Sequence, residues 1–431
     1  MISVSRLSKF IASLMGLALL FSAATVTAFE DSEFDVDDTL FDDTYQSEVV
    51  SSPISGEFQI KGHYNTQSLA SDDRHPGLGL FRTRLKMRHQ WTGTERWKSD
   101  FSAHVWLDPL LKHHEARLYD AVLSIKLRPE LLLSIGNQVW VTGHADYLRG
   151  IDIWNPLDQR LPGLMDLESL RVPVFLIRAR YQLGPVHVDW VANPLFQADL
   201  LPRSDSDYSF GPDLTRYWPE TNLQTLPWGL SVQGQIRDLE WGLYHAQLFD
   251  RQFHVKLQPE PQAHYAFIQR DGVSARMPWR DLVFKGELAY RQHLRYGPIE
   301  RPFSRWDLLL GLDYFGIKKT QIGIELLRRQ VMDYAPILMS QFPYVAEHDI
   351  ETVMSYQRDF YREQVQALVL WGRLGTGSNE PYYLKGQLDI ELGEQRDLSI
   401  GYIDYQSGNR ASIFDYFVGQ DRFFANMTVS F

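Results

Sequence analysis

The sequence contains no cysteine among its 431 residues. This excludes a disulfide framework, a thiolate metal site and a cysteine nucleophile, and it also excludes a lipid anchor on a cysteine. After residue 28, no apolar run approaches the roughly 20 residues that a membrane-spanning helix requires. A Gly-rich phosphate loop, an internal repeat and a low-complexity tract beyond Pro53 are also lacking. Two alternatives remain, a soluble protein or a protein that crosses lipid as β-strands.

Basic residues are missing from residues 29–55, which contain nine acidic side chains, whereas the whole chain has a formal net charge of −11. This stretch is poor in aliphatic residues, which predicts a disordered, acidic periplasmic segment. Because it holds most of the negative charge, the rest of the chain is close to neutral and binding to nucleic acid is not indicated. Residues 1–28 predict a signal peptide, with Arg6 and Lys9 before an apolar run and small residues ending at Ala28.

Aromatic residues are abundant, with 21 Tyr, 24 Phe and 12 Trp, yet the mean hydropathy is −0.29. This combination is typical of strands that have one face toward lipid and the other toward water. From residue 56 onward, segments of about ten residues with alternating polarity are separated by connectors that are alternately short and long. The pattern predicts an all-β fold, a transmembrane antiparallel β-barrel over residues 56–431. The strand count is about 18, or 16 if the weakly patterned segment 346–357 and its hairpin do not form strands.

The segment 421–431 has Phe423, Ala425 and Met427 on one face of a strand and ends in Phe431. It resembles the C-terminal assembly signal of Gram-negative outer-membrane proteins. The resemblance implies a location in the cell outer membrane, contact with outer-membrane lipid, and recognition of Phe431 by the barrel-insertion machinery.

A second resemblance concerns residues 131–181. They resemble a motif in a family of proteobacterial outer-membrane barrels of unassigned function and are similar, more loosely, to the alginate-export porins. The matching residues are Gly136, Gln138, Gly143, Asp152, Asn155, Pro156 and Asp158. Asn137 stands where the family has Arg, and Thr142 stands where it has Trp. The resemblance implies a porin-like transport component, an arginine-rich pore for a polyanion, and a periplasmic or inner-membrane exporter as partner.

If the apolar positions face lipid, the opposite parity lines the pore. By this rule cations follow one another along the segment 80–91, and two more lie on 172–183. The predicted pore-lining or substrate-contacting residues are Arg82, Arg84, Lys86, Arg88, Arg178 and Arg180. Two interpretations stay open: a wall of salt bridges with inner acids such as Asp100 and Asp189, or a screened basic ladder that lowers the barrier for an anionic solute.

The connector 142–171 is too long for a hairpin tip and is rich in Asp, Trp and an Asn-Pro turn. Folded inward, it would constrict the pore; packed over the mouth, it would cover the barrel. The first alternative predicts a charged constriction formed by Asp146, Arg149, Asp152, Asp158 and Arg160.

The predicted function is an outer-membrane channel or export conduit that passes a small or polymeric anionic solute through a basic-lined lumen. Two alternatives remain: a non-conducting scaffold or binding barrel that partners other envelope proteins, and an outer-membrane hydrolase that uses His104 or His187. No nucleophile is marked by spacing, so the sequence predicts no enzymatic activity, and it predicts no cofactor or metal.

Overall fold

The computed structural model describes residues 54–65, 78–94, 97–108, 113–164, 170–204, 206, 208–209, 214–256, 260–297, 299, 301–340, 344–393, 395–409 and 412–430. The predicted signal peptide, most of the acidic segment and Phe431 lie outside these residues, so the predictions made for them stay predictions.

Alternating polarity produces strands throughout the described part of the chain. They are β1 (Ile54–Asn65), β2 (Leu78–Thr94), β3 (Trp97–Asp108), β4 (His113–Arg128), β5 (Leu131–Gln138), β6 (Val174–Leu183), β7 (Val186–Ala192), β9 (Trp228–Ile236), β10 (Leu239–Phe249), β13 (Phe267–Trp279), β14 (Leu282–Leu294), β15 (Phe303–Tyr314), β16 (Thr320–Val331), β17 (His348–Phe360), β18 (Val365–Leu374), β19 (Tyr382–Gly393), β20 (Arg396–Gln406) and β21 (Arg422–Ser430).

These strands form one 18-stranded sheet in which sequence neighbours pair antiparallel. The sheet closes on itself, because β1 pairs with β2 on one side and with β21 on the other, from Glu57 opposite Ser430 to Asn65 opposite Arg422. The predicted all-β antiparallel barrel is therefore confirmed. The uncertain segment 346–357 lies largely within β17, which pairs with both β16 and β18, and the count is 18 rather than 16.

The two faces of each strand differ as a barrel in lipid requires. On β15, Leu308 and Leu310 are exposed on the outside, whereas Asp307 and Leu309, which alternate with them, are completely buried on the inside. The same alternation recurs around the barrel, and it leaves a band of exposed apolar side chains that would face acyl chains. This band includes Leu243, Val273, Leu288, Leu326, Met354, Val369, Leu388, Ile400 and Met427.

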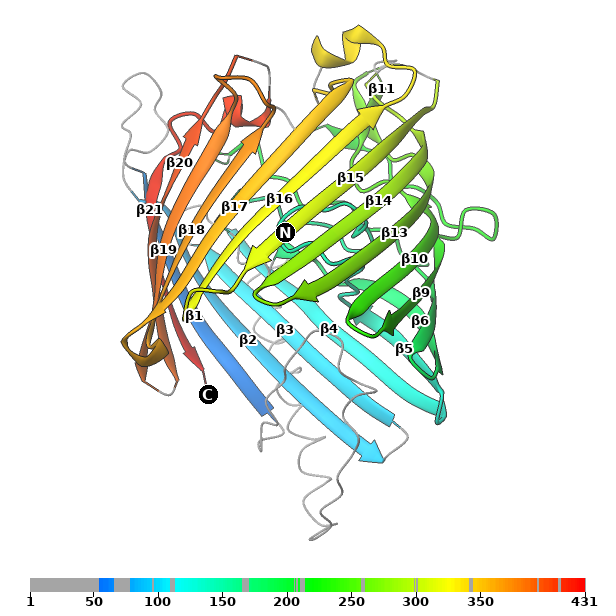
Figure 1. The fold of residues 1–431 in the computed structure, drawn as a ribbon, viewed down its shortest axis with the longest axis horizontal. Coiled ribbons are helices and arrows are strands. Elements are labelled where there is room, and N and C mark those ends of the chain that lie inside the picture. Colours follow the sequence, from blue (N-terminus) through cyan, green and yellow to red (C-terminus); the bar gives the residue numbers. More distant parts are fainter. Residues whose placement is uncertain are drawn as a thin grey trace. The chain divides into compact units, whose positions relative to one another are not determined.

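Short turns and long connections separate to opposite ends of the barrel (Figure 1). Residues 129–130, 184–185, 237–238 and 280–281 are short turns, and the longer connections carry the 3₁₀ helices η2 (Pro336–Ser340) and η4 (Ile413–Tyr416). One short connection forms the 3₁₀ turn η3 (Tyr361–Glu363). Among the described residues, no helix has the length and apolarity to span a membrane.

The alternating polarity of residues 263–276 predicts a single strand, but the structure divides this segment. β12 (Gln262–His264) leaves the barrel and pairs with β11 (His254–Lys256) and, in parallel, with β8 (Thr215–Arg216). β13 begins at Phe267 and returns to the barrel. Pairing with a connection from elsewhere in the chain satisfies the backbone of β12 and explains the division, which local alternation does not reveal.

Candidate functional site

The connection between β5 and β6 folds into the barrel. We call its described residues, 139–164 and 170–173, the inner loop. Their contacts are with inward-facing side chains of β14 and β16 on one side and of β20 on the other. The loop therefore crosses the lumen and does not cover the mouth from outside.

Glu287 on β14 holds the first part of the inner loop. Its Oε1 accepts hydrogen bonds from the backbone N–H of His144 at 2.6 Å and of Ala145 at 3.1 Å, and its Oε2 accepts one from Ile151 at 2.8 Å. A carboxylate that accepts several backbone N–H groups gives strong, charge-assisted bonds and replaces the water that these groups would otherwise need.

Glu325 on β16 repeats the arrangement one step further along the wall. It accepts from the backbone N–H of Asp146 at 2.7 Å, Tyr147 at 3.0 Å and Leu148 at 2.8 Å. Lys285 on β14 adds a side-chain bond to Asp146 at 2.5 Å and also contacts Asp313 at 2.7 Å. We call the inner faces of β13–β17 the clamp wall.

Two glycines allow this close approach. A Cβ atom on Gly143 would lie 2.2 Å from a carboxylate oxygen of Glu287, and one on Gly150 would lie 2.4 Å from the other oxygen. Gly143 also has a φ of +89°, which favours glycine. The carbonyl oxygen of Gly150 accepts a hydrogen bond from Arg270 on β13. Side chains larger than hydrogen at these two positions would push the loop off the wall.

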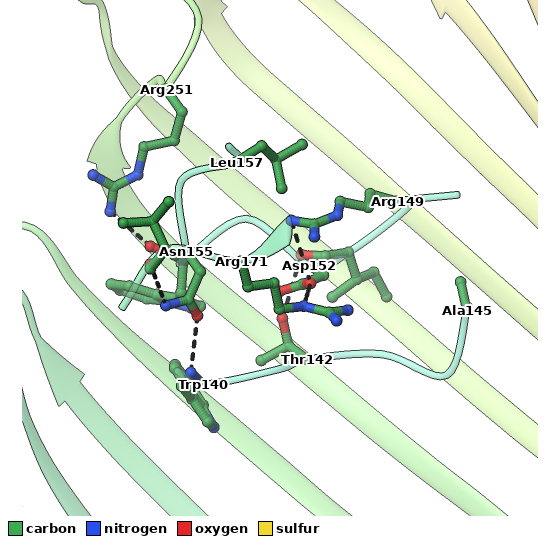
Figure 2. A network of polar contacts seen from close by, with 12 residues as sticks. Trp140, Thr142, Ala145, Arg149, Asp152, Asn155, Leu157, Arg171 and Arg251 are labelled. Carbon is green, nitrogen blue, oxygen red and sulfur yellow. Dashed lines mark hydrogen bonds and ion pairs between the residues drawn. The ribbon is translucent and has the colours of Figure 1, made fainter. Parts of the chain in front are cut away.

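Asn155 ties the inner loop to its own ends (Figure 2). Its Oδ1 accepts from the Trp140 N–H at 2.8 Å, and its Nδ2 donates to the carbonyl oxygens of Gln138 at 3.2 Å and Val172 at 3.0 Å. Asp152 lies beside these Asn155 hydrogen bonds, where it pairs with Arg171 at 2.8 Å and with Arg149 at 3.6 Å. The loop is thus a folded unit with its own polar core.

The far part of the inner loop reaches the strands on the other side. The Tyr405 hydroxyl of β20 donates to the Pro162 carbonyl, and a Cβ on Gly163 would lie 2.7 Å from Ile403. Arg160 binds Asp158 through two bonds of 2.8 and 2.5 Å and binds Glu115 of β4 at 2.5 Å. The five predicted constriction residues therefore form three groups along the loop. Asp146 lies on the clamp wall, Arg149 and Asp152 lie beside the Asn155 hydrogen bonds, and Asp158 and Arg160 lie near β4.

The predicted ladder on β2 lies on the inside of the barrel. In the pairing registers, Arg84 is opposite Gln59, Lys86 is opposite His104 and Arg88 is opposite Ser102. Each of these three partners is buried on the inner face. Arg88 approaches Asp100 at 3.7 Å, and the side chain of Arg82 lies outside the described residues. We call the inner faces of β1–β4 the basic wall.

Arg178 and Arg180 on β6 also point inward, but they share one acid. Both bind Asp189 of the neighbouring strand β7, at 2.9 and 3.0 Å, and Asp189 is completely buried. Arg178 also lies over the Trp140 ring of the inner loop at 5.5 Å. This part of the predicted ladder is a salt-bridged wall, as the first of the two interpretations describes.

The connection between β7 and β9 contacts the inner loop and holds it through hydrogen bonds of Asp199. Asp199 accepts from the Leu157 N–H at 2.9 Å and from the Gln159 side chain at 3.1 Å. Burial raises the pKa of Asp199 to about 7, and burial lowers the pKa of nearby Arg251 to about 10. Arg251 donates to the Trp154 carbonyl of the inner loop at 2.7 Å.

Two residues considered for the hydrolase alternative, Ser102 and His187, each contact an aspartate. Ser102 is bonded to Asp120 at 2.9 Å rather than to a histidine. His187 lies 3.6 Å from Asp189, which already binds two arginines. Among the described residues, no group of three or more His, Asp and Glu side chains could hold a metal ion.

Comparisons with known proteins give the fold. No family model and no curated protein matches the sequence. Among solved structures, OccK5 (OpdH) of Pseudomonas aeruginosa has a TM-score of 0.51 at 10% identity, covering 88% of this chain and 97% of that one. OccK11 (OpdR) of the same organism has a TM-score of 0.49 at 12% identity and covers 88% and 95%. The outer membrane protein opdK has a TM-score of 0.48 at 10% identity and covers 88% and 98%.

The chain is thus a porin-like β-barrel. Its closed sheet and apolar outer band place it in the outer membrane in contact with lipid.

Proposed function

We propose that the protein is an outer-membrane channel or export conduit for an anionic solute, and that the solute passes along the basic wall. The observation that carries this proposal is the asymmetry of the inner loop. Six backbone N–H groups fix it to Glu287 and Glu325 on the clamp wall. On the basic wall it is held by side-chain contacts with β4, Arg160 with Glu115 and the Tyr119 hydroxyl with the Arg171 carbonyl, beside a cavity that Lys61, Arg84 and Arg117 line. The route left beside the loop is therefore lined with positive charge.

Electrostatics favour an anion on this route. Cations on one strand lie about 7 Å apart from one inward position to the next, and their fields add inside a narrow, low-dielectric lumen. Arginine also binds carboxylate and phosphate groups in a bidentate manner. Acids that lie on neighbouring strands, such as Asp100, screen the field without removing it.

We propose the inner loop as the constriction. Asp158 and Arg160 lie where the loop meets the basic wall, and Asp146 lies with its side chain 42% exposed where it meets the clamp wall. Asn155 and Asp158 belong to the motif that resembles the family of unassigned barrels, and we propose that members of that family use a similarly folded loop. An exporter partner and recognition of Phe431 by the insertion machinery remain part of this proposal.

Reversal potentials across a planar lipid bilayer with a KCl gradient test the proposal. The wild-type protein should conduct and prefer chloride, and Arg84→Glu with Arg180→Glu should shift the preference toward potassium. Arg203→Glu with Lys318→Glu, which makes the same charge change at exposed connections, serves as the control. A conducting double mutant with wild-type selectivity would discard the basic route.

A non-conducting scaffold is the second candidate, because much of the lumen is filled. One apolar cluster includes Trp140 and Trp154 of the inner loop with Leu176, Leu248 and Ile268 of the barrel. A second cluster joins inner-loop side chains to the β7–β9 connection, to β20 and β21, and to η4 with the residue after it. Its members are Leu161, Leu164, Tyr208, Ile403, Tyr405, Phe414, Phe417 and Phe424. Bilayers that stay silent with correctly folded protein would favour the scaffold.

A further inference from the structure

The outer face of the barrel carries a carboxylate and a histidine beside its apolar band. His245 of β10 pairs with Asp271 of β13, and both have the outward parity of their exposed neighbours Leu243 and Val273. His245 Nδ1 lies 2.7 Å from Asp271 Oδ1, and the two side chains are 32% and 46% exposed, so the pair is accessible from the membrane. A carboxylate on a lipid-facing wall costs free energy that a cationic group would offset.

The pair lies in a hollow of about 460 Å³ that crosses five strands, from β9 to β15. Two parallel rows of outward residues, each paired across the strands, form the hollow. The row closer to the long connections contains Leu230, His245, Asp271, Tyr290 and Trp306. The other row is apolar throughout and contains Val232, Leu243, Val273 and Leu288. A volume of this size is typical of sites for small ligands.

The chemistry of the first row suits a cation. Among the described residues, the lining contains one carboxylate, that of Asp271, and no lysine or arginine. The rings of Tyr290 and Trp306, which continue the row from Asp271, lie 4.5 Å apart between centroids. Aromatic faces attract ammonium groups, and they do so more strongly away from water.

Asp271 is fixed in position and can still accept hydrogen bonds. His245 contacts its Oδ1, and Gln269 Nε2 donates to its Oδ2 at 3.0 Å. A carboxylate has about four lone-pair sites, so Asp271 can accept additional bonds from a ligand. The site therefore combines an oriented negative charge, two aromatic rings and an apolar surface.

Asp404 of β20 provides a matched comparison, several strands away around the barrel (Figure 1). It also faces outward, because it pairs with the exposed Leu384 and follows the completely buried Ile403. Gln406 Nε2 donates to it at 3.1 Å, as Gln269 does to Asp271. The two aspartates thus share parity and a glutamine partner, but Asp404 lies outside the hollow.

We propose that this hollow binds a lipid whose head group carries a primary ammonium. The ammonium donates to Asp271 and lies against Tyr290 and Trp306, while an acyl chain covers the apolar row that includes Leu243 and Leu288. The polar row lies toward the long connections and the apolar row toward the middle of the barrel wall, which is the order of head group and chain in a leaflet. The inference goes beyond the proposed function and does not depend on conduction.

Nuclear magnetic resonance tests the site on the full chain, labelled with ¹³C at histidine and solubilised in dodecyl maltoside micelles. The His245 signal is assigned from His245→Gln. The probes are dodecylammonium, with an amine and a chain; dodecanol, with the chain but no charge; and ethylammonium, with the amine but almost no chain. Dodecylammonium should shift the His245 signal saturably, and each of the other two should bind at least tenfold more weakly.

Membrane lipids extend the test. Phosphatidylethanolamine added to the micelles should reproduce the saturable shift, and phosphatidylglycerol with identical chains should not. The signal of His348, an outward histidine of β17 that lies outside the hollow, should not follow the same saturation curve and reports the general charge of the micelle.

Variants separate the parts of the site. Asp271→Asn should weaken dodecylammonium at least tenfold, as expected for the loss of a charge-assisted bond, and Trp306→Leu should weaken it about threefold. Val273→Trp fills the hollow from the apolar row and should abolish binding without touching the lumen. Asp404→Asn should leave binding unchanged.

Three results would overturn the inference. A shift that never saturates, or an equal saturable shift with dodecanol, would mean that the hollow holds hydrocarbon without selecting the head group. Equal weakening by Asp271→Asn and Asp404→Asn would mean that any outward carboxylate attracts the amine. Undiminished binding to Val273→Trp would place the ligand elsewhere on the barrel.

Discussion

The clamp wall and the basic wall belong to one sheet and follow the same alternation, yet they handle inward charge differently. On the clamp wall, Asp307 is completely buried between Arg291 at 2.8 Å and Arg305 at 2.7 Å. Glu287 and Glu325 on the same wall accept hydrogen bonds from six backbone N–H groups of the inner loop. On the basic wall, Arg88 and Asp100 are 3.7 Å apart with side chains 31% and 25% exposed. The clamp wall fixes the backbone of the loop, whereas the basic wall contacts the loop through a few side chains and lines a small cavity beside it.

The largest effect should come from releasing the loop. Glu287→Gln with Glu325→Gln replaces two carboxylates that accept six backbone N–H groups. Hydrogen bonds to a charged group contribute about 1.5–3 kcal/mol each, so the loop should leave the wall. We expect the single-channel conductance to rise at least about twofold, since the constriction widens.

Asp389→Asn is the matched control, because Asp389 binds Gln387 at 2.8 Å and has no contact with the inner loop in the described structure. If the double glutamate variant conducts like the wild type while remaining folded, the clamp wall does not set the constriction.

A matched pair of aspartates measures the difference between the walls directly. Asp307→Asn should lower the free energy of unfolding by about 3–5 kcal/mol, because it leaves two buried guanidinium groups without their carboxylate. Asp100→Asn on the basic wall should cost less than about 1 kcal/mol, as for a solvated ion pair. Urea unfolding in lipid vesicles gives both values, and equal losses would erase the distinction.

A smaller effect should follow pH through Asp199, where two connections meet. Its pKa is raised to about 7 by burial, with Arg251, Asp250 and Arg149 as its charged neighbours. The folded state keeps the proton to a higher pH than the unfolded chain does. Stability should therefore fall by about 2–3 kcal/mol between pH 5 and pH 8 and change little above that.

Asp199→Asn cannot ionise and should flatten this dependence. The measurement is hydrogen exchange at the Leu157 amide, whose N–H donates a hydrogen bond to Asp199 in the wild type. Exchange with the same pH profile in both proteins, after correction for the intrinsic rate, would show that Asp199 does not couple the two connections.

Much of the fold could be predicted because it depends on the pattern of polar and apolar residues within each short segment. Alternation predicted the strands and a count of about 18 with 16 as the alternative, and the parity of the apolar positions predicted that Arg84, Lys86 and Arg88 lie on the inner face. The division of the segment 263–276 escaped prediction because β12 pairs with β8, almost fifty residues away in the chain.

The candidate site was predicted less completely. The residues of the inner loop were identified from their unusual length and composition, but whether the loop entered the lumen stayed open. What decides its position is Glu287 and Glu325, which lie 136 or more residues from the backbone groups that they bind. Inward acids in a barrel look alike in sequence, and nothing local distinguishes an acid that pairs with a neighbouring arginine, such as Asp189, from one that holds a loop.

The pairing of β1 with β21 has a consequence for biogenesis. The hydrogen bonds that complete the ring join Glu57 to Ser430, almost the full length of the barrel sequence apart. Until β21 is synthesised and delivered, β1 and β20 each present a row of unsatisfied peptide groups that hydrocarbon cannot solvate. Insertion of a nascent or truncated chain should therefore stall as an open sheet. Whether β1 is paired with β21 is then enough for envelope quality control to distinguish a closed barrel from a defective one.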